Sequence, residues 1–222
     1  MAFAASTNPV VASMAGGRDT ELADLGNYFV AITPTPGTGI ISGGSVQAFT
    51  ETTPLLVVYN GNATDVKIYP AYLRLRITVV GVTASAQTYL TNTLDTGNRL
   101  SSAGTTLTKA NLNMASSITS GAVCTFGAVV ATAASGNRRV VSHSVVRSLT
   151  IGVIHDTISL NWGHSAQSLT STLINNTTSH SDTVINVAPV VIGSGQSMVL
   201  VHWANSQTTG TTYEVEFAYV EK

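Results

Sequence analysis

The stretch TLDTGNRL, residues 93–100, contains a motif that is typical of one class of catalytic site. Its Asp-Thr-Gly triplet at 95–97 is the one with which aspartic proteases place two carboxylates together, so that the pair shares a proton and activates a water molecule. That chemistry needs an apolar strand leading into a buried pair. Here the approach is the polar run TYLTNTL, and Asn98 follows where proteases usually have Ala or Ser. We therefore expect a hairpin or loop, with Asp95 bonded to local backbone or to Arg99.

The histidines are the other candidates for chemistry. His155 and Asp156 are neighbours, and neighbours in a strand point to opposite faces, so they chelate one ion only if they lie in a turn. His180 and Asp182 could share a face, but two ligands fall short of a structural zinc site. No Gly-x-Ser-x-Gly elbow frames a serine nucleophile, and no glycine-rich stretch has the lysine and context of a phosphate-binding loop. We expect no enzyme, no metal site and no cofactor.

Composition narrows the function classes further. Charged residues make up 9% of the 222, against roughly 25% in an average domain, and the net charge is −1. Scattered basic residues argue against direct nucleic-acid binding, and no apolar run reaches the roughly 20 residues of a membrane span. The single cysteine, Cys124, lies in an apolar run, so we expect a buried, inert thiol. A surface of Ser and Thr with few charges suits a protein packed beside copies of itself or another partner.

Most of the chain has the pattern of short strands separated by Gly, Asn, Ser and Pro. In YEVEFAYV the four apolar or aromatic positions share one face and the two glutamates the other. Helices are expected only within 17–29, which Gly26 would end, and for a turn or two within 106–114. The expected strands are 28–33, 40–50, 55–59, 65–69, 72–80, 85–93, 122–132, 139–147, 149–154, 157–162, 183–192, 197–204 and 213–220.

Strands without interleaved helices predict an all-β, antiparallel sandwich or barrel. An eight-stranded jelly roll with extra strands fits the length best, as a single β-sandwich domain over 27–222. Residues 1–26 are expected to form an extended N-terminal arm that grips a partner. Within it, Phe3, Pro9 and Val10 are the expected contacts. Trp162, at a strand-to-loop transition, is expected to lie in the core or to fill a partner's pocket.

The segments AYLRLRITVVG, LDTGNRLSSAGTTLTKANLNMASS and SLTIGVIHDTISLNWG resemble small all-β structural proteins of tailed-bacteriophage virions. More narrowly, the chain is similar to the β-sandwich decoration or cement proteins of the head, which are often trimers. The resemblance implies a homotrimer that binds the major capsid protein, or another virion protein, and stabilises the shell. It also implies a place in the virion after assembly in the host cytoplasm, and it carries over no catalytic residue.

Two other roles stay open at this level. The chain could itself be a single jelly-roll capsid protein that forms the shell, although residues 1–26 hold only Arg18 against three acidic side chains, where genome-enclosing proteins commonly have a basic arm. It could also be the receptor-binding tip of a fibre or spike. A tip should present aromatic loops, and the long loops here are nearly all Ser, Thr and Asn.

Overall fold

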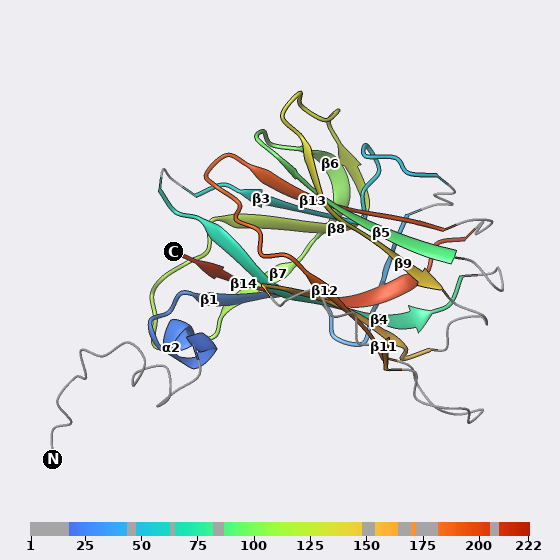
Figure 1. Ribbon diagram of the computed structural model, residues 1–222. Coiled ribbons are helices and arrows are strands. Elements are labelled where there is room, and N and C mark those ends of the chain that lie inside the picture. The colour runs from blue at the N-terminus through green and yellow to red at the C-terminus, as the bar shows by residue number, and fades with distance from the viewer. Residues whose placement is uncertain are drawn as a thin grey trace, which may run out of the picture.

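The computed structural model describes residues 18–43, 48–62, 65–81, 87–147, 154–163, 170–171, 182–204 and 209–222. These residues form two sheets packed face to face (Figure 1). Sheet A contains, in spatial order, β11 (Thr170–Ser171), β12 (Asp182–Val187), β10 (Thr157–Trp162), β4 (Ile68–Val79), β14 (Thr212–Glu221), β1 (Tyr28–Ile32) and β7 (Thr108–Asn111), and β2 (Ile40–Ile41) also pairs with β14. Sheet B contains β6 (Leu100–Thr106), β8 (Ala122–Ala131), β3 (Leu56–Asn60), β13 (Ser197–Ala204), β5 (Gln87–Asp95) and β9 (Arg139–Arg147).

The strand order is that of a jelly roll. Eight strands, β1, β3, β4, β5, β9, β10, β13 and β14, can be counted one to eight along the chain. Sheet A then reads 1-8-3-6 and sheet B reads 2-7-4-5. The first and last strands are adjacent, and consecutive strands lie in different sheets except for the fourth and fifth, which pair in sheet B. This double-sheet arrangement confirms the predicted all-β, jelly-roll-like sandwich. The added strands β6, β7 and β8 are inserted between the fourth and fifth, and β11 and β12 between the sixth and seventh.

The core between the sheets follows from alternation along the strands. Tyr213, Val215 and Phe217 of β14 are buried, as are Leu73 and Leu75 of β4, while the residues between them face outward. Cys124 lies in this core, fully buried, as expected. Burial raises the pKa of its thiol to about 12, which keeps it protonated and unreactive.

A second layer covers part of the outer face of sheet B. Val57 of β3 and Val199 and Val201 of β13 point away from the main core, yet they are fully buried against Val129 of β8. β8 pairs with β3 up to Phe126, and it pairs with β6 on its other side from Thr125 to Ala131. Gly127 has a φ of 97°, and a Cβ there would lie 2.8 Å from the Ile41 carbonyl oxygen. Glycine is therefore required where the strand changes direction.

Helix α2 (Arg18–Asp24) packs on the outer face of sheet A, below it in Figure 1. Its Leu22 and Ala23 contact Tyr28, Ala218 and Val220 of the sheet. Gly26 ends it with a φ of 73° and a hydrogen bond to the Ala23 carbonyl, as the sequence predicted. The described part of the expected arm, residues 18–26, thus packs on the sandwich, and residues 1–17 lie outside the described residues.

Several expected boundaries were wrong. The helical turn expected within 106–114 is strand β7, because pairing with β1 outweighs local helix propensity. Strands expected at 65–69 and 72–80 are the single strand β4, which tolerates Pro70 beside a register shift against β14. β6 was not expected at all, and the strand expected at 40–50 covers only β2 among its described residues. The strand expected at 149–154 falls almost entirely outside the described residues. β12 ends before Pro189, and its pairing with β10 is parallel.

Candidate partner-binding surface

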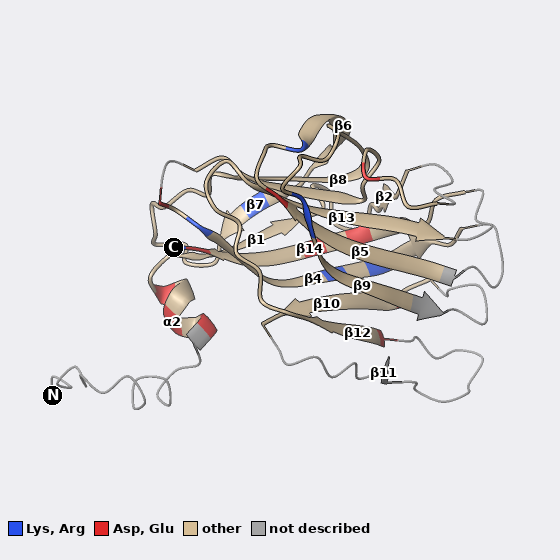
Figure 2. Cartoon of the chain, turned by 45° about the horizontal axis from the view of Figure 1, so that its top comes forward, with Lys and Arg blue, Asp and Glu red and all other residues tan. Residues whose placement is uncertain are grey.

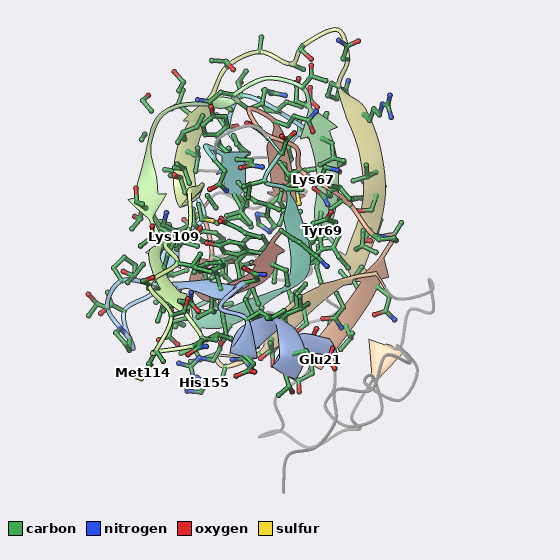
Figure 3. All side chains as sticks on the ribbon, turned by 90° about the vertical axis from the view of Figure 1, so that its left-hand side faces the viewer. Glu21, Lys67, Tyr69, Lys109, Met114 and His155 are labelled. Atoms are coloured by element: carbon green, nitrogen blue, oxygen red, sulfur yellow. The ribbon has the colours of Figure 1, made fainter. Side chains whose placement is uncertain are left out.

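The end of the sandwich beside α2 carries an exposed apolar cluster, which we call the end patch: Leu25, Leu112, Met114 and Ile118. Their side chains are 64%, 50%, 101% and 46% exposed. Leu25 follows α2, and the other three belong to the β7–β8 loop (Figure 3 labels Met114 near α2). Exposed large apolar side chains that gather in one place mark interaction sites more often than scattered ones do.

Side-chain amides hold the end patch in place. Asn111 donates from Nδ2 to the carbonyl oxygens of Gly26 and Ile118, at 2.9 and 3.0 Å. Asn113 donates to the Asp24 carbonyl at 2.7 Å, and its Oδ1 accepts from the Ala115 amide at 2.9 Å. These bonds tie the loop to the end of α2, so the apolar side chains stand on an ordered base that loses little entropy on binding.

An aromatic pocket of about 680 Å³ lies beside α2, which contributes Asp19 and Leu22 to its lining. Its aromatic residues are Tyr28, Tyr69, Tyr72 and Trp162, and Pro70 and Pro189 add two rings. Asp19 and Lys222 are the charged residues that line it. Its volume falls within the usual range for ligand sites, roughly 300–1,000 Å³.

Two tyrosines of this pocket, Tyr28 and Tyr72, remain neutral phenols. Burial, together with the nearby charges of Asp19 and Glu216, raises the pKa of Tyr28 to about 12. Burial and a hydrogen bond to Glu216 also raise the pKa of Tyr72. Both phenols therefore stay protonated near neutral pH and offer ring faces and hydrogen bonds.

Beside the pocket, the outer face of sheet A carries paired charges. Arg74 and Arg76 of β4 form ion pairs with Glu216 and Glu214 of β14 (Figure 2). Glu216 also accepts a hydrogen bond from the Tyr72 hydroxyl. The charges of these two pairs therefore cancel locally.

Asp95 is a structural carboxylate. It is buried at the end of β5 and accepts hydrogen bonds from Arg99 and Ser135, so the predicted bond to Arg99 is confirmed. β5 pairs with β13 and β9 and not with β6, so the connection is a loop rather than a hairpin. Burial alone would raise the pKa of this carboxyl, but the hydrogen bonds from Ser135, Arg99 and Gly97 outweigh burial and hold the pKa below its ordinary value.

The described histidines lie apart. His155 stands in a turn with a φ of 81°, and His143 accepts or donates a 2.8 Å hydrogen bond at Nδ1 with the Thr91 hydroxyl. His202 is buried against Tyr213. Within the described ranges, no three His, Cys, Asp or Glu side chains come close enough to hold a metal ion, and no helix is long and apolar enough to cross a membrane. His164 and His180 fall outside those ranges.

Of the expected partner contacts, Phe3, Pro9 and Val10 lie outside the described residues. Trp162 is described and only 5% exposed, with its ring edge-on to Phe217 at 6.1 Å between centroids. It belongs to the core and also lines the aromatic pocket. Its contact with a partner stays a prediction.

Sequence reasoning missed the end patch. The signal was present in NLNMASSITS, residues 111–120, where Asn and Ser alternate with Leu, Met and Ile. Asn and Ser at such spacing bond to backbone two residues on and fix loops, so apolar residues between them are held outward. Because a helical turn or two was expected within 106–114, the sequence did not predict an ordered loop with outward apolar side chains.

Comparisons with known proteins add little. No protein-family model matches the chain, and no curated protein matches its sequence. Among solved structures, the chain shows a weak match to VP1 of human polyomavirus 6, solved as a pentamer. The match has 8% identity and a TM-score of 0.25, and it covers 88% of this chain and 94% of that one. The fold assignment therefore rests on the strand order described above.

Proposed function

We propose that this protein is a non-enzymatic structural component of a virus particle, a decoration protein that binds the head shell as a homotrimer and stabilises it. The observation that carries the proposal is the end patch, four exposed apolar side chains on a hydrogen-bonded base. Such a surface favours a permanent protein partner, because leaving it in water is costly.

The fold and the charge distribution support the same proposal. Jelly rolls are common among viral coat proteins, although a fold alone does not define a function. Paired charges on sheet A and a low overall charge allow many copies to pack side by side without mutual repulsion.

A shell-forming capsid protein is the second candidate, and the strand order of a single jelly roll favours it. It differs from decoration in one measurable respect, which is self-assembly. A shell protein forms closed particles alone, whereas a decoration protein stays a small oligomer until a shell is supplied.

The mass of the purified protein in solution, followed by mixing with empty heads, tests the proposal. We expect a mass three times the 23.0 kDa of the chain and saturable co-sedimentation with heads of the virus that encodes it. Closed particles formed without heads would favour the shell role, and binding to host cells with none to heads would favour a receptor-binding tip.

A further inference from the structure

The aromatic pocket lies where the described chain begins. Asp19 and Leu22 of α2 line it on one side, and Trp162, Pro189 and Val190 line it at the ends of β10 and β12. Residue 17 therefore precedes a helix that itself forms a wall of the pocket. Seventeen extended residues span up to about 55–60 Å, enough to reach the pocket of the same copy or of an adjacent one.

The aromatic lining of the pocket has the chemistry of a site for an extended peptide. Tyrosine, tryptophan and proline rings line the grooves that recognise extended, proline-containing segments. Trp162, which is 5% exposed, and Pro189 both belong to this lining.

The sequence before α2 fits these requirements. MAFAASTNPVVASMAGG contains no charged side chain, although 9% of the whole chain is charged. It would bring no unpaired side-chain charge into the pocket, and burying an unpaired charge is costly. Pro9 restricts Asn8 to extended backbone and is followed by Val10 and Val11, so the segment has an extended apolar centre.

We propose that residues 1–17 of this chain occupy the aromatic pocket, with Pro9, Val10 and Val11 against its aromatic rings. The segment covers the half-buried rings of Tyr69 and Tyr72 and packs between α2 and Pro189. This seating needs no shell and no trimer, so it can be tested apart from the proposed function.

Photo-crosslinking of the full-length protein tests the seating. With Val10→p-benzoylphenylalanine, irradiation should link position 10 to peptides that contain residues 69–72 or 189–190, as identified by mass spectrometry. The mass of the linked product, one chain or two, tells which copy supplies the segment, and either result supports the proposal.

A matched pair of variants makes the test specific. Pro189→Arg places a charge on an exposed residue that lines the pocket, and should lower the yield of this cross-link at least five-fold. Ala188→Arg makes the same change at the exposed neighbour outside the lining and should leave the yield unchanged. Cross-links that fall elsewhere, or equal yields in the two variants, would overturn the proposal. Far-UV circular dichroism confirms that both variants are folded.

Discussion

Asp95 and Arg99 form an ion pair of 3.0 Å whose two side chains are 0% and 2% exposed. The arginine also donates to the carbonyl oxygens of Thr132 at 2.8 Å and Glu51 at 3.1 Å. The aspartate accepts from the amide and the hydroxyl of Ser135. One pair thus joins the β5–β6 loop to two other segments, and the triplet that suggested a protease serves to connect loops.

Removing one charge of this pair should be costly. Asp95→Asn keeps the shape but leaves Arg99 buried without its counter-charge, and we expect a loss of about 3–5 kcal/mol in the free energy of unfolding. Asp182→Asn, at an exposed aspartate, should change it by less than about 0.5 kcal/mol. Urea titration measures both. A loss below about 1 kcal/mol for Asp95→Asn would show that the pair is not structural.

Acid should destabilise the protein in two steps, of which His202 causes the first. Burial lowers the pKa of His202 to about 4, so between pH 6.5 and 4 the unfolded chain binds a proton that the folded chain does not. Stability is full above pH 6.5 and falls by about 3 kcal/mol as the pH drops to 4. Asp95, with its lowered pKa, contributes only below about pH 4, where its stabilisation is lost on protonation.

Substitution of histidines separates these steps. In His202→Gln the fall in unfolding free energy between pH 6.5 and 4 should largely disappear, whereas in the exposed-site variant His143→Gln it should remain. Urea midpoints at pH 7, 5.5 and 4 provide the measurement. An unchanged pH dependence in His202→Gln would refute the assignment.

Gly127 should be intolerant of a side chain. Its φ of 97° and the 2.8 Å approach to the Ile41 carbonyl predict that Gly127→Ala costs about 1–3 kcal/mol or more. Gly136→Ala, where the added Cβ meets nothing within 4 Å, should be nearly neutral. Thermal unfolding of the two variants side by side checks this, and equal melting temperatures would contradict the account of how β8 crosses sheet B.

The sequence predicted well the strands that form the core between the two sheets. It predicted poorly the second layer on sheet B, to which β6 belongs. Strands with one buried face, such as β14, show strict alternation of Tyr213, Val215 and Phe217 against Glu214 and Glu216, and this pattern is readable locally. β6 has the sequence LSSAGTT, whose small, exposed residues carry no alternation, so its pairing with β8 decides its structure.

The candidate surface was harder to predict than the fold. The pocket is built by three strands that meet only after folding, and these strands supply Tyr28, Tyr69, Tyr72 and Trp162. The spacing of residues within one segment therefore cannot predict it. For Met114, the Asn and Ser residues of the loop do give a local signal, but its meaning depends on the contact of Asn113 with Asp24 of α2.

The end patch allows a charge substitution that leaves the fold intact. Met114→Lys changes a fully exposed side chain, and we expect a change in unfolding free energy of less than about 0.5 kcal/mol. Val79→Lys is the matched control. Val79 is also exposed, at 56%, and it is the last residue of β4. If Met114→Lys unfolds the protein, the loop is part of the core and not a docking surface.

The most direct measurement is a co-sedimentation titration of empty heads with the full-length protein, Met114→Lys and Val79→Lys. The account predicts saturable binding of the unsubstituted protein and of Val79→Lys, and an affinity at least ten-fold weaker for Met114→Lys. Equal binding by all three proteins, or no binding to heads by the unsubstituted protein, would contradict the claim that the end patch attaches a decoration protein to a shell.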